Sequence, residues 1–273
     1  MLHDLNLARR LEAAHARDGE VSAEAHARLN PEGGSSYERI AGGSMIFCGV
    51  GSFLTHALGL GVNTSVSDED LDRLETFYFE RGSPAEIDLC PFSDPTLAGR
   101  LFERSYRPDH FEQALVREVI PEDGSAVAET VEDISIEPAT PDLVIPYCDL
   151  LTRGFDLPPE YGGALVQAGR ITFASEGVRI YAALSGARLI AAGSMRMEDG
   201  VVGLSGATTL PEFRRRGLQT ALLTLRLRDA AREGCDLAAV NAMVGTTSQR
   251  NIERAGFHPA YTRTVLVKPC QGC

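Results

Sequence analysis

Basic residues are scarce in this chain: 26 Lys and Arg stand against 38 Asp and Glu, giving a net charge of −12. An acidic protein is repelled by phosphate backbones and anionic headgroups, so neither nucleic acid nor a membrane surface is expected as its main partner. No apolar run approaches the roughly 18 residues that suggest a membrane span. The N-terminal residues mix acids with bases and lack the apolar core of a secretory signal. These absences predict a cytoplasmic protein.

Cysteines are also few. Six cysteines at irregular spacings in 273 residues do not form a disulfide framework. Only Cys270 and Cys273 have the spacing of a metal or redox pair, and a single pair lacks the further ligands that a structural zinc site needs. We therefore predict no metal ligands, and the role of the terminal cysteine pair is left open.

Two passages of the sequence resemble each other. FERSYRPDHFEQALVRE (102–118) and IERAGFHPAYTRTVLVK (252–268) both place Glu-Arg before a turn, and Pro108 matches Pro259 with one extra residue in the second copy. Further along the same register, Leu-Val-Arg matches Leu-Val-Lys. The alternative is a chance similarity between two helix-turn-strand units. The shared register predicts an internal repeat.

The order of helical and strand-like runs predicts an α+β fold with two similar domains. The predicted domains are 1–126 and 134–273, joined by an acidic, turn-rich linker at 127–133, and each has a mixed, mostly antiparallel sheet flanked by helices. In the first domain we expect helices at 2–17 and 23–29 and strands at 44–50 and 53–62. In the second we expect strands at 134–139, 179–184, 188–198, 201–210, 236–243 and 260–268, and helices at 141–155, 160–171, 218–233 and 247–255.

The stretch EFRRRGLQTALL (212–223) concentrates positive charge in an acidic protein. Leucines spaced along one face predict a helix that begins near Gly217. The first N–H groups of a helix have no intrahelical partner and, with the helix dipole, attract anions. Three arginines at that end oppose the dipole unless a bound anion offsets them. A pyrophosphate fits this pattern, and a solvated basic turn is the alternative.

Arg214-x-x-Gly217, at the end of a strand and the start of a helix, resembles the acyl-CoA pyrophosphate loop of the GNAT superfamily of N-acetyltransferases. The later TTSQRNIERAGF (246–257), a short helix ending in Gly-Phe before a last strand, resembles the end of the same fold. Gln219 departs from the pattern, because the superfamily usually has Gly or Ala at this place. The resemblance covers residues 135–268 and implies acetyl-CoA as the acyl donor and a small-molecule or peptide amine as the acceptor.

The resemblance also implies roles for individual residues. The strand residues before the loop would bind the pantetheine arm through their backbone, the loop and first helical turn would wrap the pyrophosphate, and one amide would flank the far side of the cofactor. These predicted cofactor residues are Ala207, Thr208, Thr209, Arg215, Arg216, Gly217, Leu218, Gln219, Thr220 and Asn251.

The first half has no such loop. At the corresponding helix start Ser67 is a plausible N-cap, and Asp68, Glu69 and Asp70 follow it in the first turn. Carboxylates there would satisfy the helix end internally and repel phosphate. We therefore predict a degenerate first copy and one acyl-CoA per chain, bound by the second half.

The residues for proton transfer are less clear. The superfamily often protonates the departing thiolate with a tyrosine, and Ile252 occupies that position here. Tyr261 is the nearest phenol in sequence and becomes the catalytic candidate. Two hypotheses follow: an N-acyltransferase, or an acyl-CoA-binding sensor that has lost its acid. The sequence leaves the acceptor, the acyl chain length and a homodimer open.

Overall fold

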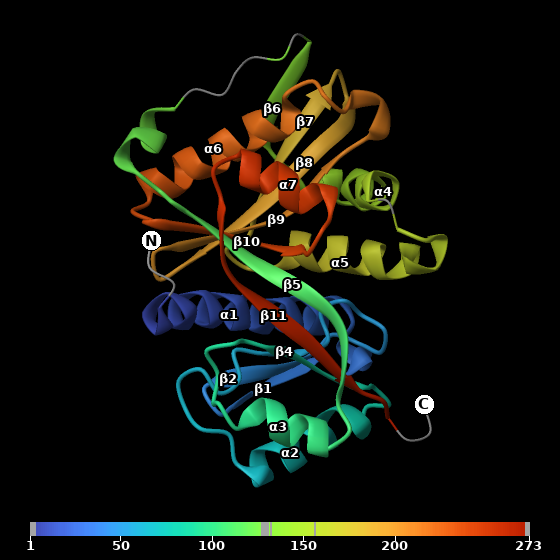
Figure 1. Cartoon of the computed structure of the whole chain (residues 1–273). Coiled ribbons are helices and arrows are strands. Elements are labelled where there is room, and N and C mark those ends of the chain that lie inside the picture. Colours follow the sequence, from blue (N-terminus) through green and yellow to red (C-terminus); the bar gives the residue numbers. More distant parts are fainter. Residues whose placement is uncertain (1–3, 127–130, 132, 156, 271–273) are drawn as a thin grey trace. The chain divides into compact units, whose positions relative to one another are not determined.

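The computed structural model describes residues 4–126, 131, 133–155 and 157–270 (Figure 1). The chain forms two compact units: unit 1 comprises Met1–Val116 and Asn241–Cys273, and unit 2 comprises Arg117–Val240. Within the described residues, no helix is both long enough and apolar enough to cross a membrane.

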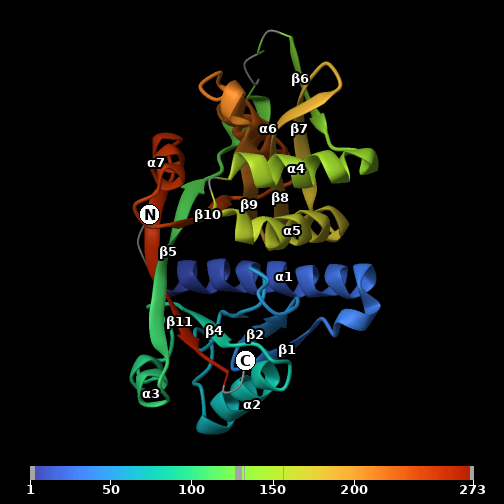
Figure 2. The same cartoon turned by 90° about the vertical axis from the view of Figure 1, so that its right-hand side faces the viewer.

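Unit 1 is built on a sheet with helices on both faces. Its elements are α1 (Leu5–Leu29), β1 (Ser36–Ile40), β2 (Gly43–Phe47), β3 (Ala57–Leu58), α2 (Asp68–Phe79), β4 (Ala85–Leu89), α3 (Leu97–Glu103), β5 (Arg107–Glu118), α7 (Thr247–Arg254) and β11 (His258–Lys268). The strand order is β1-β2-β3-β4-β11-β5, and only β3 and β4 pair in parallel. Helix α1 covers one face, and α2 packs on the other (Figure 2).

Unit 2 repeats this design. Its elements are β6 (Ile134–Pro138), α4 (Val144–Gly154), α5 (Gly162–Ala174), β7 (Arg179–Ser185), β8 (Arg188–Glu198), β9 (Val201–Thr209), α6 (Leu218–Arg232) and the first part of β10 (Leu237–Met243). The strand order is β6-β7-β8-β9-β10, antiparallel except for β9 with β10. Helix α6 lies on one face, and α4 and α5 lie on the other (Figure 1).

Each unit therefore contains one parallel pair, and a helix connects its two strands: β3-α2-β4 in unit 1 and β9-α6-β10 in unit 2. Parallel neighbours need such a crossover, whereas the antiparallel pairs β1–β2, β7–β8 and β8–β9 are joined by tight turns. The hairpin between β8 and β9 turns at Asp199 and Gly200, both with positive φ, as the sequence predicted. The predicted fold class, α+β with mixed, mostly antiparallel strands flanked by helices, is confirmed.

Two predictions in the first half were wrong. The helical runs at 2–17 and 23–29 form one continuous helix, α1, because Gly19 packs against β2: a Cβ there would lie 2.9 Å from Cγ1 of Ile46. The run at 53–62 gives a strand of only two residues, because Gly59 and Gly61 adopt positive φ and turn the chain away.

The equivalent strands of the two sequence copies pair with each other. Strand β11 lies between β4 and β5, and in its antiparallel register with β5 Leu266 faces Pro108 while Pro259 faces Leu115. Since Pro108 corresponds to Pro259 and Leu115 to Leu266, a local twofold axis relates the two strands. This relation supports the predicted repeat.

The compact units do not coincide with the predicted domains, because β11 belongs to the second sequence copy and to unit 1. The domain division at 127–133 therefore stays a prediction about the repeat. Within that predicted linker, residues 127–130 and 132 lie outside the described residues.

The last strand is expected to carry much of the stability of unit 1. Leu266 is fully buried in the core with Ile87 and Tyr106. Leu266→Ala should lower the free energy of unfolding of unit 1 by about 2–5 kcal/mol. Leu29→Ala, the same change at a half-exposed position of α1, should cost less than about 0.5 kcal/mol. Urea unfolding followed by circular dichroism measures both, and equal losses would contradict the placement of β11.

Candidate functional site

The candidate site begins where α6 begins. Gly217 is the N-cap residue, with a φ of 76° in the left-handed region, and no side chain caps the helix. Two residues earlier, Arg215 also has a positive φ of 65°, which is uncommon for a residue with a side chain. Residues 214–217 are exposed. The first N–H groups of α6 are therefore available to a ligand.

Arg214 holds the loop in place. Its Nη2 donates to the carbonyl oxygen of Gly154 at 2.8 Å, and its Nε donates to the carbonyl oxygen of Thr209 at 3.3 Å. The side chain thus ties the loop to the end of α4 and to the end of β9. This arginine therefore positions the loop.

The next two arginines, Arg215 and Arg216, are exposed. Among the described residues, no carboxylate forms an ion pair with Arg215 or Arg216. The guanidinium of Arg216 lies 5.0 Å from the ring centre of Phe213, and the nearby Glu212 pairs with Arg188 at 2.6 Å instead. Positive charge at the positive end of a helix is unfavourable by itself. The arrangement is therefore complementary to an anion with several negative oxygens.

Strand β9 separates from its parallel neighbour just before this loop. The pairing of β9 with β10 covers Val201–Gly203 and Leu237–Ala239 and goes no further within the described part of unit 2. Beyond it, β9 stays paired with β8 on its other edge. The predicted pantetheine residues Ala207, Thr208 and Thr209 all lie on this one-sided length, as extended ligand binding through the backbone requires.

A β-bulge precedes these residues and was missed in the sequence. The register between β8 and β9 shifts between Ser205 and Thr208, and Gly206 in the shifted part has a φ of 60°. A Cβ on Gly206 would lie 2.5 Å from the hydroxyl of Tyr147, so only glycine fits. The signal was a glycine inside a strand-like run, which often marks a bulge or a close approach.

A short polar chain lies beneath the bulge. The Oγ atoms of Ser194 and Ser205 are 2.8 Å apart, and Tyr147 hydrogen-bonds Ser194. Burial raises the pKa of Tyr147 to about 12, although the bond to Ser194 acts in the opposite direction. Ser205 is exposed, whereas Ser194 is fully buried. The chain therefore leads from the interior of unit 2 to its surface at the bulge.

The remaining predicted residues of the first helical turn have separate tasks. The Nε2 of Gln219 donates to the carbonyl oxygen of Thr208 and to Oγ1 of Thr209, both at 2.8 Å, so this side chain joins α6 to the end of β9. Leu218 is buried in the core, and Thr220 is exposed. The departure at Gln219 from the superfamily pattern thus has a structural reason, and its N–H still lies in the first turn.

The helix start of the first half is closed, as predicted. Ser67 caps α2 by accepting from the N–H of Asp70, whose carboxylate in turn accepts from the N–H of Ser67. Asp68 pairs with Arg100 at 2.7 Å. Close by, the Asp94 carboxylate accepts from the N–H of Val66 at 3.1 Å. Carboxylates fill the positions that phosphate oxygens would need.

Two predicted residues lie in unit 1. Asn251 is exposed on α7, and its Oδ1 accepts from Arg254 at 3.2 Å. Tyr261 is buried, and its hydroxyl donates to Oε1 of Glu12 at 2.6 Å, beside Arg263, which donates to the same oxygen at 2.7 Å. Burial and the Glu12 carboxylate raise the pKa of Tyr261, while Arg263 lowers it less. These contacts favour a packing role for Tyr261.

Comparison with known proteins supplies the fold. No protein-family model and no curated sequence matches the chain. Among solved structures, a GCN5-related N-acetyltransferase from Kribbella flavida superposes with a TM-score of 0.65 at 17% identity, over 93% of this chain and 95% of that one. A tandem GNAT protein from the clavulanic acid biosynthesis pathway superposes with a TM-score of 0.60 at 14% identity, over 90% and 86%. The chain has the tandem GNAT fold.

The resemblance inferred from the arginine-glycine loop is thus confirmed at the level of the fold. The crossover helix of each unit starts differently: the start of α2 is closed by carboxylates, whereas the start of α6 has no side-chain cap and follows three arginines. At 14–17% identity the neighbours define the architecture and leave the activity to be tested.

The buried position of Tyr261 generates a prediction. Tyr261→Phe removes a hydrogen bond to a carboxylate, so unit 1 should lose about 1.5–3 kcal/mol in its free energy of unfolding. The rate constant kcat for acyl transfer should stay within about threefold of the parent value, because the Tyr261 hydroxyl is engaged by Glu12 and is not expected to transfer a proton in the reaction. A loss of kcat well beyond tenfold, with stability unchanged, would instead make Tyr261 the general acid.

Proposed function

We propose that the chain is an acyl-CoA-dependent N-acyltransferase that binds one acetyl-CoA at the start of α6. The observation that carries the proposal is the uncapped helix start, with Arg215 and Arg216 lacking carboxylate partners among the described residues. A pyrophosphate supplies the negative oxygens that both the N–H groups and the guanidinium groups need. The tandem GNAT fold supports the same reading.

The pantetheine arm would follow the one-sided part of β9. Ala207, Thr208 and Thr209 lie on the length of β9 that is paired with β8 and not with β10. Because the carbonyl oxygens of Thr208 and Thr209 already accept from Gln219 and Arg214, the amides of the arm would pair with the remaining backbone groups of this edge. Hydrogen bonds to charged groups contribute about 1.5–3 kcal/mol each. The loss of several such hydrogen bonds at the pyrophosphate would raise the Kd for acetyl-CoA by several orders of magnitude.

Acyl transfer requires a neutral amine, a held carbonyl and a proton for the departing thiolate. Ile252 cannot supply that proton, and the Tyr261 hydroxyl is engaged by Glu12. We therefore propose that solvent protonates the thiolate. The acceptor is an amine on a small molecule or peptide, and Asn251 as a cofactor contact stays a prediction.

A second candidate function is an acyl-CoA sensor without turnover. Ile252 in place of the usual tyrosine favours it, because a sensor has no need of an acid. Both functions share the binding site, so binding alone does not distinguish them.

Binding is tested by one glycine exchange with a matched control. Gly217→Glu adds a carboxylate where phosphate is expected and should abolish acetyl-CoA binding in a calorimetric titration. Gly234→Glu is the control: Gly234 lies just after the other end of α6, also with positive φ and with nothing within 4 Å of a Cβ, so the backbone strain is matched. It should leave Kd within about threefold, a change of less than 1 kcal/mol.

The parent protein should bind close to one acetyl-CoA per chain, and Asp68→Ala at the closed helix start should leave both stoichiometry and Kd unchanged. A stoichiometry near two, or equal affinity in Gly217→Glu and the parent, would contradict the proposed binding site. The arginines would then be interpreted as a solvated basic turn.

Turnover separates the enzyme from the sensor. With acetyl-CoA and a panel of small and peptide amines, an N-acyltransferase releases free CoA thiol faster than the amine-free control, and Gly217→Glu should remove that excess. Tight acetyl-CoA binding with no amine-dependent thiol release across the panel would favour the sensor.

A further inference from the structure

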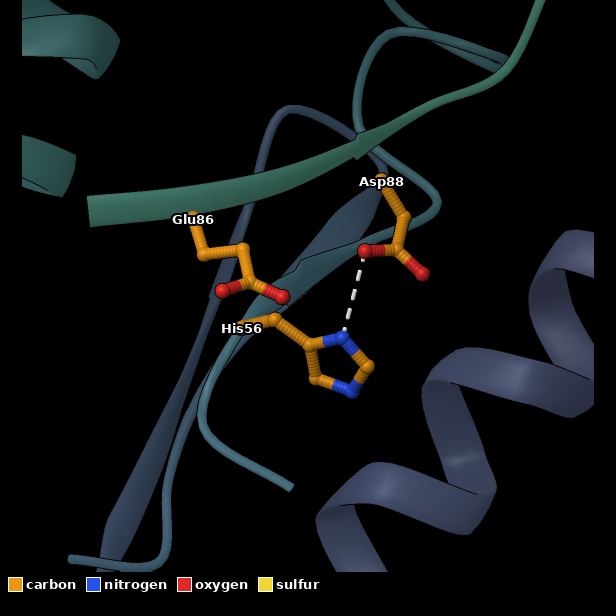
Figure 3. A group of neighbouring side chains, drawn as sticks. All are labelled: His56, Glu86 and Asp88. Carbon is orange, nitrogen blue, oxygen red and sulfur yellow. Dashed lines mark hydrogen bonds and ion pairs between the residues drawn. The ribbon is translucent and has the colours of Figure 1, made fainter. Parts of the chain in front are cut away.

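Three side chains with metal-binding atoms meet on one face of unit 1. Strands β3 and β4 pair in parallel at Ala57 and Ile87, which brings His56 beside the two acidic neighbours of Ile87. Since side chains alternate along a strand, Glu86 and Asp88 point to the face opposite Ile87. The ligand atoms of His56, Glu86 and Asp88 all lie within 4.8 Å of one another (Figure 3).

Helix α1 adds unpartnered polar atoms to this region. The rings of His15 and His56 meet edge to face with their centres 6.0 Å apart. Nδ1 of His15 is buried and, within the described residues, has no hydrogen-bond partner; the same holds for Oε2 of Glu12, one turn earlier on α1. A buried polar atom without a partner costs about 1–3 kcal/mol. We therefore expect a ligand, a water molecule or an ion to interact with these atoms.

The local charge is also unbalanced. Arg263 is paired with Glu12 at 2.7 Å and lies 3.7 Å from Glu112, so its positive charge is already matched by those carboxylates. His56 pairs with Asp88 at 3.2 Å, so among the described residues Glu86 is the carboxylate of this group without a cation. A divalent cation bound by neutral His56 would neutralise both Glu86 and Asp88 at once.

We propose that His56, Glu86 and Asp88 bind one divalent transition-metal ion. Imidazole and carboxylate ligands together suit Zn²⁺ and its first-row neighbours, whereas Mg²⁺ and Ca²⁺ prefer oxygen alone. The sequence predicted no metal ligand, because positions 56, 86 and 88 have no recognisable spacing; the β3–β4 register brings them together. The site lies in the copy without the cofactor loop and does not depend on acyl-CoA binding.

The test uses the full chain carrying Cys270→Ser and Cys273→Ser, so that the terminal cysteine pair cannot bind the metal. After dialysis against a chelator, Zn²⁺ is titrated by calorimetry, and Co²⁺ binding is followed by its visible absorption. We expect one equivalent with a Kd of about 1 μM or tighter. His56→Gln and Asp88→Asn should each weaken binding by at least about tenfold.

His258→Gln, at an exposed histidine of β11 in the same unit, is the matched control and should bind like the parent. Glu86→Gln provides a second ligand variant at a partly exposed position, and circular dichroism in chelator establishes that each variant is folded. The proposal is overturned if the parent binds no Zn²⁺ at micromolar concentration, or if the folded ligand variants bind it as tightly as His258→Gln does.

Discussion

Every α-helix starts with N–H groups that no residue of the same helix can satisfy. The two halves of this chain answer that constraint in opposite ways. At α2, Ser67 and Asp70 form a capping box, and Asp68 is paired with Arg100, so the helix start is complete without a ligand. At α6, Gly217 offers no capping side chain, and the preceding arginines raise the positive potential further. One fold thus presents one helix start closed by its own side chains and one without a side-chain cap.

The neighbouring elements are arranged around the open start. Arg214 anchors the loop through two carbonyl oxygens, and Gln219 ties the first turn of α6 back to Thr208 and Thr209. The bulge at Gly206 and the early end of the β9–β10 pairing free one edge of β9 immediately before the loop. The unpaired edge of β9 thus comes just before the arginine loop. We propose that this order suits a cofactor with an extended arm that ends in a pyrophosphate.

Local patterns in the sequence predicted much of this. The leucine spacing gave α6 at 218–233, against Leu218–Arg232 in the structure, and the Asp-Gly pair located the β8–β9 hairpin. The contrast between Ser67 and Gly217 at the two helix starts was also visible. These features depend on neighbours within a few residues of each other, where propensity and capping act.

What depended on distant residues could not be predicted. A glycine such as Gly19 disfavours a helix locally, and the contact with Ile46 that requires a glycine there is made by a residue far away in sequence. No local pattern predicts that β11 lies between β4 and β5. The contact of Tyr261 with Glu12 joins residues far apart in sequence, so a phenol that suited catalysis by position is engaged in the interior. The meeting of His56 with Glu86 and Asp88 arises in the same way from strand register.

Hydrogen exchange with and without acetyl-CoA tests the central claim most directly, because it reports on the N–H groups themselves. The account predicts that acetyl-CoA slows exchange at the amides of residues 215–220 and leaves those of residues 66–70 unchanged. Slower exchange at the start of α2, or no change at either helix start under conditions where acetyl-CoA is in large excess, would contradict it.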